Sequence, residues 1–155
     1  MPDIPSPDDT HASRKRWMAI LARASADTIE THLAAAGTIP AFARLRGPEV
    51  GLVMARGRTG GGGAQFNLGE VAVTRCTVRS TDGLLGHAYV TGRDGRHAEL
   101  AAQVDALMQD PNRAPILERS VIAPLEAVEN ARRARTAAKA EATKVRFFAM
   151  RNMRT

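Results

Sequence analysis

Cysteine is almost absent from this 155-residue chain, which contains only Cys76. A single cysteine excludes an intramolecular disulfide and any metal or iron–sulfur site built from several cysteine ligands. Aromatic residues are also scarce, at 4% of the chain. The core must therefore be filled mainly by aliphatic and small side chains. Such a thin core makes stabilisation by a partner or by self-association a reasonable expectation.

Long apolar runs are missing as well. No stretch approaches the about 20 apolar residues that a membrane-spanning helix needs. The first nine residues hold three prolines and three aspartates, without the basic and apolar regions of a signal peptide. The sequence therefore predicts a cytoplasmic protein with no membrane span. Residues 1–9 are expected to form a disordered tail, because they offer little to bury, and residues 10–155 a single domain.

The positive charge is concentrated near the C-terminus. The formal net charge is +6, yet residues 132–155 hold eight basic side chains and only one acid, Glu141. The preceding 131 residues are close to neutral. The positive charge therefore belongs to one segment, and this segment will attract negatively charged surfaces.

Sequence patterns in the first 91 residues change from helical to β-rich. Apolar residues recur at helical spacing from about Thr10, and Ser25 can cap a second helix. Short β-rich runs follow, with turns expected at residues 47–49 and 81–83. The expected strands are residues 42–46, 50–56, 70–80 and 84–91.

Helical spacing returns after Gly92. A buried stripe is expected on a central helix at His97, Leu100, Ala101, Val104, Leu107 and Met108. Pro124 can open a long helix to about Thr143. Small side chains on this helix, which would let a partner approach closely, are Ala131, Ala134, Ala138 and Ala142. With a last strand at residues 145–150, the prediction is an α+β fold: an antiparallel sheet of four or five strands packed with an N-terminal helix pair, a central helix and a long C-terminal helix.

The glycine-rich run at residues 57–63 could bind an anion, because backbone amides in such loops can converge on phosphate oxygens. Gly60, Gly61 and Gly62 are the candidate contacts. The run lacks the lysine and the strand–loop–helix order of a P-loop. A flexible connector is therefore favoured, with an anion or partner contact as the alternative.

The start of the central helix holds a second candidate site. Asp94 can cap the helix, and His97 falls on the buried stripe as a core histidine hydrogen-bonded to the sheet. Alternatively, Arg93 and His97 face a phosphate at the helix start. Residue types favour the structural interpretation. Glu99 points almost opposite to His97, so this pair is disfavoured as a metal site, and no metal is expected.

A third candidate is the basic face formed by Arg132, Arg135 and Lys139. It could neutralise nucleic-acid phosphates, but aromatic residues for base stacking are nearly absent. The face also flanks the alanine positions, so a solvated surface or a protein contact is favoured. The sequence contains no nucleophile elbow, no recognisable carboxylate pair and no zinc-protease motif. Residue patterns alone therefore assign no catalytic residue.

Six groups of short motifs occur in order between about residues 13 and 152. They are RWMAILA at 16–22, VTR at 73–75, TDG at 81–83 with Gly86, GRD at 92–94 with HAE at 97–99 and DALM at 105–108, IAPL at 122–125, and VRFFAM at 145–150. Each is weak alone, but together they closely resemble the G subunit family of carbon–phosphorus lyase, the PhnG family of phosphonate metabolism. The glycine run is longer in this chain, and the N-terminal tail has no counterpart.

The resemblance implies a subunit of α-D-ribose 1-methylphosphonate 5-triphosphate synthase, used in organic phosphonate catabolism under phosphorus starvation. Family members act with the H, I, J and L subunits, and K in the larger assembly. The G subunit binds I directly, in two copies per complex. MgATP and methylphosphonate are substrates of the complex, which releases adenine. No cofactor is expected on this chain alone, and the chain is not expected to be catalytic by itself.

The resemblance also suggests a role in the complex for the candidate residues. The hypothesis is that Arg75, Arg93, Asp94 and His97 order either a substrate phosphate or a face of the I subunit, with the subunit contact preferred. Positioning and charge neutralisation are what a small basic subunit can supply. A nucleic-acid-binding module acting through the basic helix and a purely architectural subunit remain as alternatives.

Overall fold

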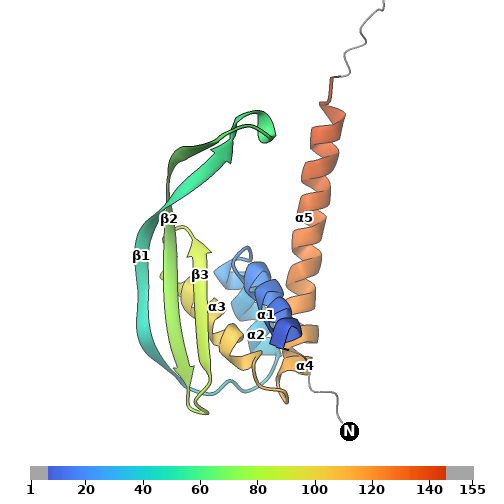
Figure 1. Ribbon diagram of the computed structural model, residues 1–155. Coiled ribbons are helices and arrows are strands. Elements are labelled where there is room, and N and C mark those ends of the chain that lie inside the picture. The colour runs from blue at the N-terminus through green and yellow to red at the C-terminus, as the bar shows by residue number, and fades with distance from the viewer. Residues whose placement is uncertain (1–6, 146–155) are drawn as a thin grey trace, which may run out of the picture.

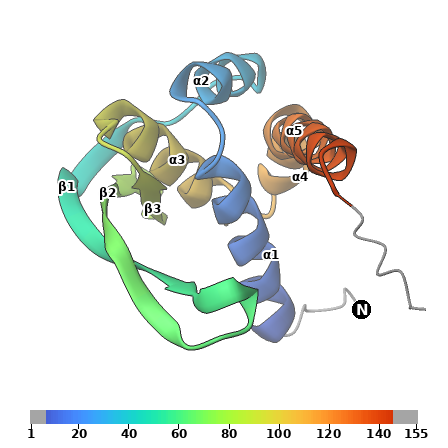
Figure 2. The ribbon, with the colours of Figure 1, turned by 90° about the horizontal axis from the view of Figure 1, so that it is seen from above.

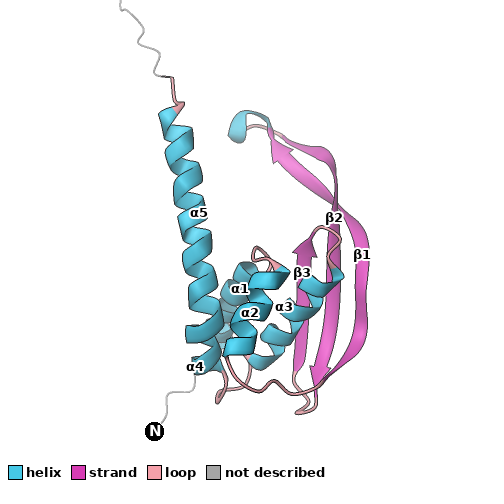
Figure 3. Ribbon diagram, turned by 180° about the vertical axis from the view of Figure 1, so that it is seen from behind, coloured by secondary structure: helices cyan, strands magenta, loops and turns pink. Residues whose placement is uncertain are grey.

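The computed structural model describes residues 7–145 and contains a three-stranded antiparallel sheet with the helices gathered on one of its faces (Figures 1 and 3). The elements in chain order are α1 (Pro7–Leu21), α2 (Ala26–Ala35), β1 (Phe42–Arg58), a 3-10 turn η1 (Thr59–Gly61), β2 (Gln65–Ser80), β3 (Leu85–Thr91), α3 (Gly95–Leu107), α4 (Ala114–Leu117), a π-helical segment η2 (Glu118–Ile122) and α5 (Ala123–Ala142). The expected α+β class is confirmed. Among the described helices, none is long and apolar enough to cross a membrane.

The described part of the chain has three strands, fewer than the four or five predicted. The expected turn at residues 47–49 is wrong, because β1 continues through this segment and pairs with β2 on both sides of it. Extra residues bulge from β1 here. The bulge does not reverse the chain, because β2 is long enough to supply hydrogen-bond partners beyond it. The strand expected at residues 145–150 falls almost wholly outside the described residues.

Helix starts are close to those predicted. α1 begins at Pro7, ahead of the expected Thr10, so residues 7–9 of the expected tail are helical. Ser25 caps α2 as expected, because its side-chain oxygen accepts a hydrogen bond from the Thr28 backbone N–H at 3.2 Å. Capping residues act over a few positions, which is why they could be identified from sequence.

The core lies between the helices and one face of the sheet. The strands and α3 supply Cys76, Val78, Ala88, Val90, Ala98, Ala101, Val104 and Leu107, and the other helices supply Trp17, Leu21, Ile29, Leu33, Val121, Ile122 and Leu125. The predicted stripe of α3 is thus buried, except for Leu100, which is partly buried. None of the described residues 43–75 belongs to this core cluster. The outer part of the β1–β2 hairpin is therefore not held by the core.

Two segments project from the same end of the body (Figures 1 and 2). One is the distal part of the β1–β2 hairpin, which extends beyond β3, since β3 ends opposite Val73. We call residues 52–72 the hairpin arm. The other is α5, in which every residue from Asn130 to the helix end is exposed. We call residues 130–142 the free half of α5.

Candidate subunit interface

The first turn of α3 carries two of the predicted site residues. Asp94 is the N-cap, and its carboxylate accepts a hydrogen bond from the His97 backbone N–H at 3.0 Å. The His97 ring is buried, with Nε2 2.8 Å from the Leu21 carbonyl oxygen of α1. Nε2 must be the donor here, because a carbonyl oxygen only accepts. The structural interpretation is thus correct for the cap, but His97 joins α3 to α1 and not to the sheet.

The two predicted arginines lie at the surface. Arg93 precedes the cap and is exposed. Arg75 lies on the sheet face opposite the helices, 3.0 Å from its cross-strand neighbour Glu49. Hydrogen bonds from Arg46, and then from Arg75, lower the pKa of the Glu49 carboxyl. His97 points into the core, so the structure does not bring its side chain together with that of Arg75, and their joint role stays a prediction.

The glycine run forms the tip of the hairpin arm. Gly60 and Gly61 have φ angles of +59° and +83°, a region that glycine adopts without steric cost. The Gly63 N–H donates to the Thr59 carbonyl oxygen at 2.8 Å and closes the turn. The run is therefore the connection between β1 and β2. An anion or partner contact at Gly60, Gly61 and Gly62 stays a prediction.

Arg132, Arg135 and Lys139 lie on α5, where they line a shallow groove with Val128 and Thr136. Val128 and Arg132 also line a second hollow, at the corner between α1 and α2. The groove along the basic face therefore adjoins a hollow on the body of the protein. This geometry suits a contact with another large molecule that lies along the helix.

Glu129 anchors the base of this basic face. Its side chain is only 10% exposed and lies 2.7 Å from Arg132 Nε and 2.8 Å from Arg133 Nε. Hydrogen bonds from Arg132, and then from Arg133, lower the pKa of the Glu129 carboxyl from an ordinary 4.5 to about 2. The carboxylate thus stays charged at any pH near neutrality.

This shift predicts a pH dependence of stability. A carboxyl whose pKa is lower in the folded state stabilises the fold above its unfolded pKa and loses that contribution as pH falls toward the folded value. We expect Glu129→Gln to be less stable than the wild type at pH 7 and to show a shallower loss of stability between pH 4.5 and about 2. Urea unfolding across this range measures both effects. Glu141→Gln, which removes an exposed pair with Lys144, is the control, and identical pH profiles for wild type and Glu129→Gln would contradict the assignment.

A buried carboxylate to which the sequence analysis assigned no role joins three elements. Asp105 of α3 is fully buried. Its oxygens accept hydrogen bonds from Arg14 Nε and Nη2 at 3.1 and 2.7 Å, from Trp17 Nε1 at 2.9 Å and from the His87 backbone N–H at 2.9 Å. Asp105 directly follows Val104 of the predicted buried stripe, and this position could have indicated that its carboxylate is buried. With four donor groups bonded to its two oxygens, Asp105 holds α1 and β3 against α3.

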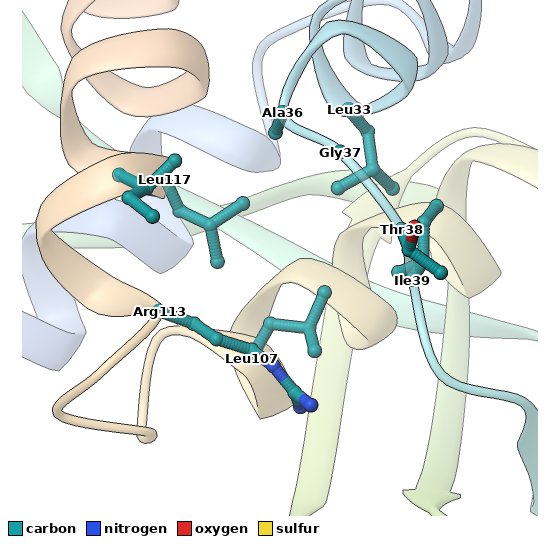
Figure 4. Close-up of a pocket in the computed structure, with 9 residues that line it drawn as sticks. Leu33, Ala36, Gly37, Thr38, Ile39, Leu107, Arg113 and Leu117 are labelled. Carbon is teal, nitrogen blue, oxygen red and sulfur yellow. The ribbon is translucent and has the colours of Figure 1, made fainter.

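The described residues include an apolar pocket but no cluster of metal-ligating side chains. Within residues 7–145, no three His, Cys, Asp or Glu side chains are placed to hold a metal ion. An apolar pocket of about 160 Å³ lies between α2, α3 and α4 (Figure 4). Its polar lining side chains are Thr38 and Arg113, and Arg113 is paired with Asp82 at 2.8 Å. This pocket can hold an apolar group but offers no acid–base pair.

Comparison with known proteins identifies the family of this chain. The model of the family described as phosphonate metabolism protein PhnG matches residues 12–152, which include almost every described element. A relative from Rhizobium meliloti (strain 1021) is named alpha-D-ribose 1-methylphosphonate 5-triphosphate synthase subunit PhnG. It is 43% identical over 148 residues, which cover 94% of this chain and 92% of the relative. The chain therefore belongs to the PhnG family of phosphonate metabolism proteins.

Proposed function

We propose that this chain is a subunit of α-D-ribose 1-methylphosphonate 5-triphosphate synthase and acts in organic phosphonate catabolism. The observation that carries the proposal is the 43% identity, over nearly the whole of both chains, to a relative with that name. In the reaction, an oxygen of methylphosphonate forms a bond to the anomeric carbon of MgATP, the bond from that carbon to adenine breaks, and adenine leaves. The triphosphate is retained and must be held still.

The chain supports this reaction inside a complex and does not catalyse it alone. The buried side chains of Asp105 and His97 support this view, because their hydrogen bonds hold α1 and α3 together. The proposed partners are the I subunit by direct contact, H and J in the core complex, and K and L in the larger assembly. Two copies of the chain per complex and a cytoplasmic location complete the proposal. MgATP is a substrate of the complex, and this chain alone holds no cofactor.

Arg93 and Arg75 are the proposed contact residues for the I subunit. Both guanidinium groups belong to exposed residues, and arginine is well suited to pair with carboxylates of a partner. Asp94 and His97 fix the backbone that presents Arg93. The alternative ligand for Arg93 is a phosphate of the substrate.

Reconstitution of the complex tests the proposal. Adenine release from MgATP and methylphosphonate should require this chain, and Arg93→Ala should reduce recovery of the complex about tenfold, as expected when one arginine anchor is lost. The exposed Arg119, on η2, supplies a control variant, Arg119→Ala, which should assemble normally.

The outcomes separate the alternatives. If Arg93→Ala assembles normally but no longer releases adenine, Arg93 contacts the substrate. If the variant both assembles and releases adenine normally, the proposed contact role of Arg93 is wrong. Adenine release that is undiminished without the chain contradicts the function. A nucleic-acid module would instead bind mixed-sequence DNA with a steep salt dependence, and a purely architectural subunit would leave the adenine release of every assembled variant unchanged.

A further inference from the structure

The hairpin arm exposes apolar side chains on both of its faces. Paired residues of an antiparallel ladder share a face, and successive residues alternate. Leu52 and Met54 lie on the face that continues the helix-covered side of the sheet, and Val53 and its partner Val71 lie on the other. Leu52 and Met54 are 57% and 49% exposed, and the two valines 36% each. The valine face of the arm is therefore apolar here, whereas the other face combines exposed Leu52 and Met54 with Glu70, which is paired with Met54.

A second apolar group lies nearer the tip of the arm. Phe66 and Leu68 are 46% and 64% exposed. They lie over Gly57, where an added Cβ would stand 2.9 Å from Leu68 Cδ1 and 3.4 Å from Phe66 Cε1. Between this group and the valines, Ala55 is paired with Gly69. Ala55 and Gly69 have little or no side chain, so the backbone of the arm is accessible to another protein at this point.

The arm receives little support from its own chain. β3 ends opposite Val73, so in the described structure the two strands of the arm have no third strand on either side. No arm residue belongs to the core cluster. A two-stranded hairpin alone is at best marginally stable in water, and an exposed apolar strand edge readily pairs with another chain. Burial of the arm against another protein would therefore stabilise a hairpin that the rest of this chain supports little.

We propose that the hairpin arm inserts into an apolar, acid-rimmed groove of another subunit of the synthase. This inference rests on the proposed function and names the surface through which the chain joins the complex. A different subunit can enclose both faces and both edges of the arm. A second copy of this chain, related by a twofold axis, would pair one patch with itself and leave the opposite face and edge open.

Charge indicates the rim of the groove. The arm carries Arg56 and Arg58 against Glu70, and the free half of α5, which projects from the same end of the body (Figure 1), carries four basic residues against Glu141. Glu129 neutralises part of this charge at Arg132 and Arg133. Both projections still carry net positive charge at the same end of the body, so acidic residues on the acceptor are complementary.

An arm-deleted variant tests the proposal. Residues 53–71 are replaced by Asn-Gly, which joins Leu52 to Ala72, two residues directly opposite each other in the ladder. Because the core cluster contains no arm residue, the variant should melt near the wild-type temperature. When it is co-expressed with the other synthase subunits, at least about tenfold less complex should be recovered. If the deletion does not fold, the double variant Val53→Asp with Leu68→Asp carries the same test.

Ile116→Asp is the matched control, because Ile116 is an exposed apolar residue of α4, at the opposite end of the body (Figure 1). Loss of assembly in the arm variants but not in this control supports the proposal. Full assembly of the arm-deleted chain overturns it, as does equal loss with Ile116→Asp.

Two further outcomes separate this proposal from the proposed function. If the wild-type chain recovers no other subunit, the proposed function fails and the arm assignment fails with it. If the wild-type chain is dimeric alone, becomes monomeric without the arm and still assembles normally with other subunits, the arm binds a second copy and only the arm assignment is overturned.

Discussion

Replacing Asp105 by alanine is expected to lower the free energy of unfolding by about 3–5 kcal/mol, as found when one partner of a buried ion pair is removed. The carboxylate is fully buried and accepts hydrogen bonds from α1 and from β3. Its removal leaves the Trp17 indole N–H and the His87 backbone N–H without an acceptor. It also leaves the Arg14 guanidinium without its counter-ion. Unpaired buried donors bear the full cost of lost solvation.

Urea unfolding at pH 7 measures this effect against a surface ion pair. Asp82→Asn removes the pairing with Arg113, in which the two side chains are 49% and 36% exposed. This control should lose less than about 1 kcal/mol. Asp105→Asn keeps the size of the side chain but replaces one acceptor by a donor, so it should fall between the two. A loss below about 1 kcal/mol for Asp105→Ala would show that α1 is not held through this carboxylate.

Gly86→Ala should destabilise the fold by about 3 kcal/mol or more, at or beyond the usual range for overpacking. Gly86 of β3 lies against α3, where an added Cβ would stand 1.9 Å from the Ala102 carbonyl oxygen and 2.8 Å from the Ala106 nitrogen. Both are backbone atoms of the helix, so no side-chain rotation can make room. The helix would have to move away from the sheet and open the core.

A second glycine provides the control for this prediction. A Cβ added at Gly51 of β1 would meet nothing within 4 Å, so Gly51→Ala should change the melting temperature little. For a chain of this size, the loss expected for Gly86→Ala corresponds to a decrease in Tm of about 6–12 °C. Equal melting temperatures for the two variants would contradict the close packing of β3 on α3.

Gly86 and Asp105 both belong to the motifs that resemble the PhnG family. The structure supplies a packing reason for each, because Gly86 allows contact between β3 and α3, and Asp105 joins α1, α3 and β3. His97 likewise joins α3 to α1, through its hydrogen bond to the Leu21 carbonyl oxygen. Several motif residues are therefore explained by the assembly of the core. The surfaces that we propose for a partner lie elsewhere, on Arg75 and Arg93, on the hairpin arm and on α5.

Local signals were sufficient for much of the fold. The stripe on α3, the Ser25 and Asp94 caps and the long helix around Pro124 depend on residues within a few positions of one another, although helical backbone already begins at Ala114. The hairpin between β2 and β3 was predictable for the same reason, because the turn at residues 81–83 lies between two β-rich runs.

The sequence by itself determined the α+β class, the caps and the family resemblance. Only the tertiary structure decided that β1 runs through residues 47–49, that the arm stands clear of the core and that Asp105 is a junction. The contacts of Asp105 with Arg14, Trp17 and His87 span 91, 88 and 18 positions along the chain. Periodicity and capping report on neighbours in sequence, whereas burial and strand pairing depend on which distant segment supplies the partner.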